Sequence, residues 1–309
     1  MDVYDLVLGL PHTNRAGLAE HLLLMQAGHF QWTSIARAVG RPLSELRTRD
    51  GAEVYGTFYF VEERFPRDTP LTGFRLDHRL TFAVPLRAFK NIAVEGRIVF
   101  DHHARLAATL GAPGPGPETA ALHPSVQLAC IFITPRENNL RLRVAPPANA
   151  DFSTIPSLPN AENPYLLTKE AETTGRLGLL DSAWVRADRQ AGFEHAYAID
   201  PDRDSNGAAL VYFANYVAFM DAAERAAWRN NGDPALVTGA VDRRVVEHRR
   251  IAYYGNVEVT GTIRTEVCLF RNPDDPGRVG IRYTIRRDTD DRPICRSEAI
   301  KALWPPAGA

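Results

Sequence analysis

The sequence predicts an α+β protein of two successive units, each with a curved antiparallel sheet wrapped around one long helix. Three observations lead to this prediction. Each half of the 309-residue chain has one long helix-like apolar run followed by several strand-like runs. The helix-like run of the second half is apolar on almost every face. A segment rich in Pro, Asn and Ser, residues 146–165, separates the halves, so we predict domains 1–150 and 151–309.

The first half begins with a predicted helix over residues 17–40. Its apolar residues, beginning with Leu18 and Leu22, recur at roughly helical spacing, and Gly40 followed by Arg41-Pro42 ends the run. Strand-like runs rich in aromatic and aliphatic residues then follow, and we expect strands at 53–65, 76–89, 91–102, 126–134 and 140–145.

The second half repeats this order of elements. A predicted strand at 192–200 precedes a predicted helix at 208–228, and laying Leu18 on Leu210 aligns the two helices. Further strands are expected at 239–246, at 251–270 with a break around Gly255 and Gly261, at 278–287 and at 293–304. A long apolar helix followed by a curved antiparallel sheet is the hot-dog arrangement, so the sequence predicts a tandem (double) hot-dog.

The second helix contains one polar residue in an apolar setting. From 208 to 220 every residue except Asn215 is apolar, which predicts a helix buried on all sides. An unsatisfied amide there would cost about 1–3 kcal/mol. Asn215 therefore either fixes the local geometry by bonding to protein groups or takes part in binding a ligand.

The residues before this helix also allow two interpretations. Asp204, Ser205 and Asn206 are favoured at helix N-caps, so the segment can be an ordinary capped start. Alternatively, free N–H groups of the first turn stabilise the oxyanion or enolate that forms when a thioester reacts. Gly207 would then let a substrate carbonyl approach the backbone closely.

The composition narrows the classes of partner. The formal net charge is −1, and no apolar stretch approaches the length of a membrane span, so we expect a cytoplasmic protein without nucleic-acid or membrane partners. The three cysteines lack metal-ligand spacing and are expected to be reduced thiols. The only His-rich spot is Asp101-His102-His103, where adjacent residues face opposite ways, so no metal site and no cofactor is predicted.

The second helix and its start resemble a known family. Asp204-x-Asn206-Gly207 followed by Leu210-x-Tyr212-Phe213-Ala214-Asn215-Tyr216 is similar to the helix-start motif of hot-dog acyl-CoA thioesterases. It resembles more closely the double hot-dog acyltransferase/decarboxylases of polyketide biosynthesis, of the leinamycin LnmK type. Further similar features are Gly17-Leu18 with Trp32, Asp50-Gly51 with Tyr55-x-x-Phe58, Arg243-Arg244-Val245-Val246, and Tyr254-Gly255-Asn256.

This resemblance implies a reaction and its partners. The family decarboxylates methylmalonyl-CoA and passes a propionyl group to an acyl carrier protein through a tyrosine nucleophile, which would match Tyr55, or Tyr59 if the register shifts. The implied substrate is a coenzyme A thioester, here methylmalonyl-CoA or a related malonyl-type thioester. The implied partner is an acyl carrier protein. A homodimer is a candidate assembly. The alternatives are an acyl thioesterase that uses Asp204 as base or nucleophile, and a non-enzymatic scaffold that binds acyl groups.

Side chains alternate between the two faces of a strand, which sorts the remaining candidate residues into two groups. Tyr55, Thr57 and Tyr59 are expected on one face of a strand, and Val54, Gly56, Phe58 and Phe60 on the other, which fits either a cleft or ordinary cross-strand packing. A tyrosine nucleophile needs a base or a stabilising cation, because its pKa is ordinarily about 10. The predicted catalytic residues are Tyr55, Asp204, Asn206 and Gly207, and the predicted substrate-binding residues are Thr57, Tyr59, Tyr212, Asn215, Arg243 and Arg244. Arg243 and Arg244, with Arg249 and Arg250, either meet phosphates or form a solvated strand face.

Overall fold

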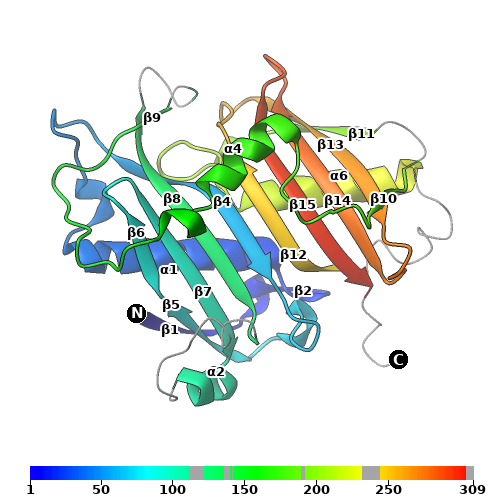
Figure 1. Cartoon of the computed structure of the whole chain (residues 1–309), viewed down its shortest axis with the longest axis horizontal. Helices are drawn as coiled ribbons and strands as arrows, with labels where there is room; N and C mark the ends of the chain where they lie inside the picture. The colour runs from blue at the N-terminus through cyan, green and yellow to red at the C-terminus, as the bar shows by residue number, and fades with distance from the viewer. Residues whose placement is uncertain (111–121, 136–139, 141, 189–191, 232–243, 304–309) are drawn as a thin grey trace. The chain divides into compact units, whose positions relative to one another are not determined.

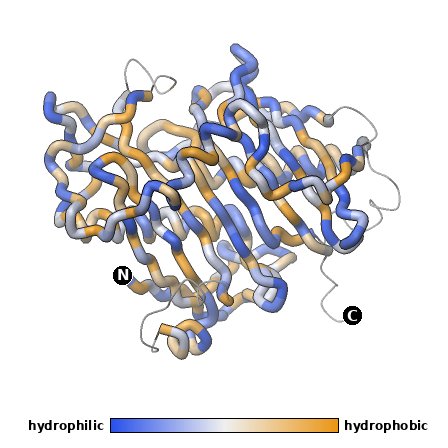
Figure 2. The backbone as a smooth tube through the Cα atoms, in the orientation of Figure 1, coloured by the Kyte–Doolittle hydropathy of each residue, from blue (hydrophilic) through white to orange (hydrophobic). Residues whose placement is uncertain are grey.

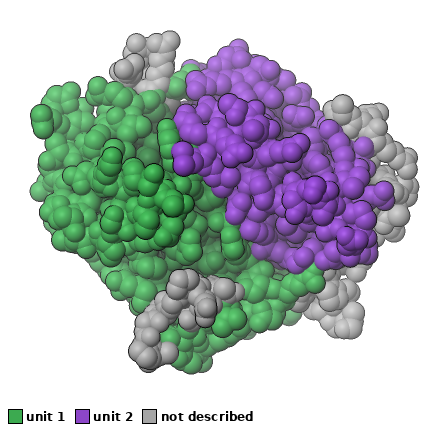
Figure 3. Space-filling view, in the orientation of Figure 1, with its two compact units in different colours: residues 1–165 green, residues 166–309 purple. Residues whose placement is uncertain are grey.

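The chain forms two compact units, Met1–Tyr165 and Leu166–Ala309 (Figure 3). A computed structural model describes residues 1–110, 122–135, 140, 142–188, 192–231 and 244–303. The division between the units falls at the end of the Pro-, Asn- and Ser-rich segment 146–165.

Unit 1 surrounds the long helix α1 (Glu20–Val39) with an antiparallel sheet in the order β1-β5-β7-β8-β4 (Figure 1). Beside it lie the short strands β2 (Thr13–Asn14) and β3 (Gly17–Leu18) and helix α2 (His103–Leu110). The strands of the sheet are β1 (Asp2–Val7), β4 (Tyr55–Arg64), β5 (Arg79–Val84), β6 (Leu86–Phe89), β7 (Ala93–His102), β8 (Ser125–Pro135) and β9 (Leu142–Val144).

Unit 2 has the corresponding elements around helix α6 (Asn215–Asn231). Its sheet has the order β11-β13-β14-β15-β12, and β10 (Val185–Arg186) also pairs with β13. The short helices α4 (Tyr165–Thr174) and α5 (Pro201–Asp204) lie before α6. The strands are β11 (Phe193–Ala198), β12 (Arg244–Tyr253), β13 (Thr262–Arg271), β14 (Arg278–Arg287) and β15 (Pro293–Leu303).

The two sheets have the same topology. In each, the strand before the long helix lies at one edge, the first strand after the helix lies at the other, and the remaining strands follow in chain order between them. Every second residue of β13 is buried, and three of these four positions are the hydrophobic residues Ile263, Val267 and Leu269; Figure 2 colours the backbone by hydropathy. The predicted tandem hot-dog fold is therefore confirmed.

Several predicted boundaries differ from the structure. The predicted strand 76–89 is two strands, because Pro85 lies between β5 and β6 and has no N–H for the ladder. The predicted run 251–270 is interrupted around Gly255 and Gly261 as expected, since residues 251–253 end β12 and β13 begins at Thr262. Residues 239–243 of another predicted strand lie outside the described residues, and the sequence prediction omitted β1, α2 and α4.

The largest correction concerns the second helix. It was predicted to begin at Ala208, but α6 begins at Asn215. The intervening backbone turns instead, with an isolated bridge between Ser205 and Val211. The Asn206 side-chain oxygen accepts the N–H groups of Ala208 (3.0 Å) and Leu210 (3.1 Å), which offers these residues an alternative to helical hydrogen bonds.

Helix α1 packs large side chains against glycines of its sheet. A Cβ atom added to Gly56 in β4 would lie 2.1 Å from the Trp32 ring, and one added to Gly96 in β7 would lie 2.5 Å from the Gln31 side-chain oxygen. Gln31 is fully buried. The absence of a Cβ at these two strand positions therefore lets the helix approach the sheet.

Helix α6 is held in unit 2 by buried charges. Glu224 accepts hydrogen bonds from Lys301 (2.6 Å) and from the Tyr283 hydroxyl (2.9 Å). Lys301 also donates to Asp221 (2.9 Å), and the Arg249 guanidinium lies 3.4 Å from the same carboxylate. The two acidic residues of the helix thus face two basic residues of strands β12 and β15, and the charges balance.

Replacing Gly56 with alanine tests the contact between α1 and the sheet. Because the new methyl group would overlap the Trp32 ring, we expect the Gly56→Ala variant to lose about 1–3 kcal/mol of unfolding free energy in urea titrations. Gly73→Ala is the matched control, since no heavy atom lies within 4 Å of its added Cβ. Equal stability of the two variants would contradict this packing.

Candidate functional site

The predicted catalytic segment of unit 2 starts at a short capped helix. The Asp200 side chain accepts the backbone N–H groups of Asp202 (3.1 Å) and Arg203 (3.4 Å) at the start of α5. Pro201 takes the first helical position, where a missing N–H costs nothing. This one-turn helix places Asp204 at its last residue.

Asp204 is a buried carboxylate that several donors already hold. Its Oδ2 atom accepts the Tyr197 hydroxyl (2.9 Å) and the Asp200 N–H (2.9 Å), and its Oδ1 atom accepts the Arg203 Nε–H (3.0 Å). Burial raises the pKa of Asp204, but the hydrogen bonds from Arg203, Asp200 and Tyr197 and the Arg203 charge outweigh it and lower the pKa overall. Asp204 is therefore ionised at neutral pH and is a weak base.

Asn206 and Gly207 lie in the turn and not at the start of the long helix. The Asn206 side chain shapes this turn, and its backbone N–H also donates to the Leu210 carbonyl (2.9 Å). Gly207 is exposed, and a Cβ there would meet nothing within 4 Å. The prediction that Gly207 opens a helix N-terminus is wrong, because the helix begins at Asn215.

The first N–H groups of α6 are occupied. Asn215, Tyr216 and Val217 donate to the carbonyls of the residues three before them, at 3.0, 3.4 and 3.2 Å. Such tightened turns satisfy the donors that a helix start otherwise leaves free. An oxyanion at this helix would have to displace these bonds.

Asn215 connects the helix to the preceding segment. Its side-chain amide donates to the carbonyls of Arg203 (3.3 Å) and Asp204 (3.2 Å). The Tyr212 N–H also donates to the Asp204 carbonyl (2.8 Å). Of the two interpretations that the sequence left open for Asn215, these bonds favour the positioning of the backbone that carries Asp204.

Aromatic side chains surround the end of this turn. Tyr212 is half-buried beside Phe213, and burial raises the pKa of Tyr212 to about 12. The Tyr253 hydroxyl donates to the Phe213 carbonyl (2.9 Å), and the buried Tyr216 ring meets the Tyr253 ring edge-on. A ligand at the turn would therefore meet aromatic surface, with the Tyr212 hydroxyl protonated at neutral pH.

Tyr55, in unit 1, has a carboxylate partner that the sequence analysis missed. Its hydroxyl donates to the Glu53 side chain at 2.5 Å, and this bond is the main reason why the pKa of Tyr55 is raised. The phenol is therefore protonated at rest, and Glu53 is placed to accept its proton. The close sequence spacing on one strand face was the signal that could have found Glu53.

A β-bulge at Tyr59 changes the predicted strand faces. Phe58 pairs with Cys130 and Phe60 with the adjacent Ala129, so Tyr59 is the extra residue. The prediction that Phe58 and Phe60 share a face is therefore wrong. Tyr59 is buried, its hydroxyl donates to Asn163 (2.9 Å), and burial raises its pKa. Thr57 is half-buried on the same strand.

The predicted phosphate-binding arginines do not form one exposed cluster. Arg243 lies outside the described residues. Arg244 lies over the Trp228 ring, 3.8 Å from its centre, and burial lowers the pKa of this guanidinium. Arg249 is fully buried. Arg250 donates to the Leu177 carbonyl (2.9 Å).

The structure thus gathers Asp204, Asn206, Tyr212 and Asn215 in unit 2, together with the two residues Tyr197 and Arg203 that the sequence analysis missed.

Among the described residues, no group of three or more His, Cys, Asp or Glu side chains could hold a metal ion. None of the described helices is both long and apolar enough to span a bilayer.

No protein-family model matches the sequence, and no curated protein matches it significantly. Solved structures, in contrast, match nearly the whole chain. A Lactobacillus plantarum protein assigned as an oleoyl thioesterase has a TM-score of 0.63 at 12% identity, covering 98% of this chain and 96% of that one. The 12:0-ACP thioesterase of Umbellularia californica has a TM-score of 0.61 at 9% identity, covering 98% and 94%.

An acyl-ACP thioesterase from Bacteroides thetaiotaomicron is also similar, with a TM-score of 0.54 at 9% identity over 97% of both chains. At such identities the likeness establishes a shared fold. The chain therefore has the tandem hot-dog architecture found in these thioesterases.

Asn215 offers a test of how the site is positioned. Replacing it with alanine would leave the carbonyls of Arg203 and Asp204 without their amide donor, so we expect Asn215→Ala to lose about 1–3 kcal/mol in unfolding titrations. Asn230→Ala is the control, because that amide makes one exposed bond to the Ala226 carbonyl on the same helix. If both variants were equally stable, Asn215 would not position this segment.

Proposed function

We propose that the protein binds an acyl thioester, carried by coenzyme A or an acyl carrier protein, and hydrolyses it. One observation carries this proposal: the chain matches acyl thioesterase structures from end to end, with both hot-dog units present. The match extends over both chains almost completely, so the shared architecture is that of whole enzymes and not of a single motif.

We place the reaction at residues 204–215 of unit 2. There an ionised carboxylate, a phenol and a guanidinium are in contact, since Tyr197 and Arg203 both bond to Asp204. Its lowered pKa makes Asp204 a weak proton acceptor, so its role is to orient the attacking water and hold Arg203. Arg203, largely exposed beside it, supplies positive charge for the carbonyl oxygen that becomes anionic. A thiolate leaves without a strong acid because its pKa is low compared with that of an alkoxide.

The acyltransferase/decarboxylase reaction is the second candidate. The sequence has no histidine between residues 196 and 247, so a histidine base is absent from the segment that resembles that family. The Tyr55–Glu53 pair supplies a base for a tyrosine nucleophile instead. In this reaction methylmalonyl-CoA loses CO₂, and the resulting enolate takes a proton from water to give propionyl-CoA. Glu53 accepts the phenol proton as the Tyr55 oxygen bonds to the propionyl carbon, and coenzyme A leaves as the thiol with that proton. An acyl carrier thiol then takes the propionyl group, and its proton returns to Tyr55.

One assay separates the two reactions. The purified protein is incubated with a series of acyl-CoA thioesters, including methylmalonyl-CoA, with and without an acyl carrier protein. Free acid and free thiol without CO₂ are expected for hydrolysis, whereas CO₂ and a propionyl-carrier conjugate would support transfer. The absence of every product would contradict both and favour an acyl-binding scaffold.

Two variants assign the site. We expect Asp204→Asn to lower kcat for hydrolysis by about 100-fold, because the water loses its orienting charge. Asp202→Asn, an exposed carboxylate on the same short helix, is the matched control and should retain activity. Tyr55→Phe should leave hydrolysis intact, and its loss of transfer would identify the second reaction.

A further inference from the structure

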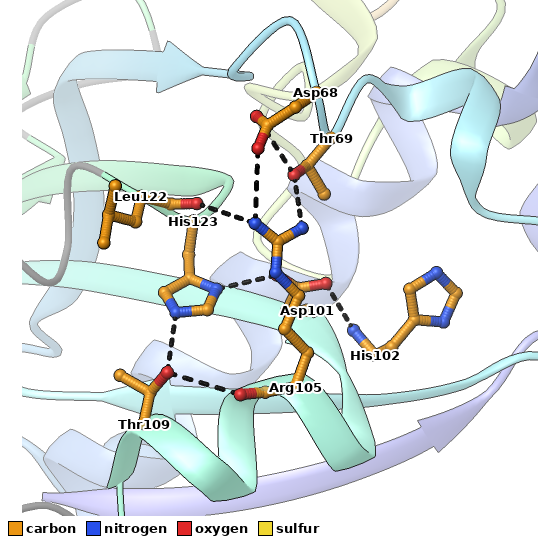
Figure 4. Close-up of polar contacts among 8 residues, drawn as sticks. All are labelled: Asp68, Thr69, Asp101, His102, Arg105, Thr109, Leu122 and His123. Atoms are coloured by element: carbon orange, nitrogen blue, oxygen red, sulfur yellow. Dashed lines mark hydrogen bonds and ion pairs between the residues drawn. The ribbon is translucent and has the colours of Figure 1, made fainter.

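In unit 1 a hydroxyl, an imidazole and a carboxylate form a row of hydrogen-bonded groups that includes none of the residues assigned to the proposed reaction (Figure 4). The His123 Nδ1 atom lies 2.7 Å from Asp101 Oδ2, and its Nε2 atom lies 3.0 Å from the Thr109 hydroxyl. Asp101 is fully buried, His123 is 4% exposed and Thr109 is half-buried. The hydroxyl is therefore the most accessible of the three groups.

The fold holds this row of groups from several sides. Asp101 lies near the end of β7, and its Oδ1 atom accepts the His102 N–H (2.7 Å). Helix α2 follows immediately and carries Thr109 back over His123. Arg105 of the same helix lies 3.4 Å from the Asp101 carboxylate and donates to the Thr69 hydroxyl (2.6 Å), so the carboxylate cannot rotate freely.

The hydrogen-bond partners of His123 indicate which of its ring nitrogens carries the proton. A carboxylate accepts only, so His123 Nδ1 carries the proton of the 2.7 Å bond. With Nδ1 as the donor, a neutral ring leaves Nε2 as an acceptor, and the one hydroxyl proton of Thr109 can be directed to Nε2 (3.0 Å) or to the Arg105 carbonyl (3.3 Å). This arrangement of nucleophile, base and orienting carboxylate is the one that activates hydroxyl nucleophiles.

Two other threonines of unit 1, Thr33 and Thr81, lack this arrangement. The Thr33 hydroxyl bonds to the carbonyl four residues earlier in α1, as the Thr109 hydroxyl also does within α2, but no histidine bond to Thr33 is seen among the described residues. The Thr81 hydroxyl donates its hydrogen bond to the Asp5 carboxylate at 2.5 Å. The His103 Nδ1 atom also lies 2.7 Å from this hydroxyl. Thr109 alone of these three meets an imidazole that a buried carboxylate orients.

We propose that Thr109, His123 and Asp101 form a second acyl-transfer site, which accepts acyl groups from small activated esters or thioesters. His123 Nε2 takes the Thr109 proton while the Thr109 oxygen bonds to the acyl carbon. The bond from that carbon to the leaving alcohol or thiol then breaks, and the leaving group receives the proton from Nε2. Water, deprotonated by the same imidazole, releases the acid and restores the hydroxyl.

Acylation of Thr109 tests this proposal. The full chain is incubated with p-nitrophenyl acetate or acetyl-CoA, nitrophenolate release is followed, and peptides of the quenched protein are mapped by mass spectrometry. We expect one acetyl group on Thr109, formed as nitrophenolate or coenzyme A is released. Thr109→Val keeps the side-chain shape but removes the hydroxyl, and should reduce nitrophenolate release at least about 100-fold.

Matched variants separate this site from a structural role. Thr109→Ser should retain most of the rate, and Thr33→Val should behave as wild type because its hydroxyl has the same helical bond without the histidine. His123→Asn should lose acetylation at residue 109. Undiminished ester hydrolysis in Thr109→Val, or a wild-type protein that neither donor acetylates at residue 109, would overturn the proposal. Neither outcome would affect thioester hydrolysis at Asp204.

Discussion

The ion pairs of Lys301 with Asp221 and Glu224 are the constraint on which unit 2 depends. Two carboxylates on a buried helix would cost several kcal/mol without partners. Lys301 from β15 and Arg249 from β12 supply those partners, and Tyr283 of β14 bonds to Glu224 as well. Because two charged side chains and one hydroxyl from three strands contact these carboxylates, they restrict the register of the helix, which places its first residue, Asn215, relative to the sheet.

The candidate site follows from that placement. Asn215 holds the carbonyls of Arg203 and Asp204, and Asn206 closes the turn between them and the helix. The backbone donors of the helix start are used within this turn. In the proposed function the side chains of Asp204, Tyr197 and Arg203 therefore contact the substrate.

Much of the fold could be predicted from the sequence, because apolar periodicity reports burial directly. Both units have the predicted order of one long helix followed by several strands, although the two halves of the sequence share almost no residue identity. The start of α6 could not be read in this way, because apolar residues 208–214 continue the helical pattern while the Asn206 side chain holds them in a turn.

The site could be predicted only in part, for similar reasons. Asp204, Asn206, Tyr212 and Asn215 are close in sequence, so their proximity could be predicted from a motif. The bulge at Tyr59 depends on pairing with β8, which no local pattern of β4 reveals. Asp101 was considered only for metal binding beside His102 and His103, whereas its partner His123 lies 22 residues away, before β8. Contacts of that separation require the fold.

The central claim is that residues 204–215 hold the acyl thioester, and hydrogen exchange with a non-hydrolysable acyl-CoA thioether tests it most directly. Amide exchange is measured by mass spectrometry on the free and the ligand-saturated protein. The account predicts that peptides covering residues 204–215 become protected from exchange when the thioether is bound. Binding of the thioether with unchanged exchange in these peptides, and protection elsewhere, would contradict it.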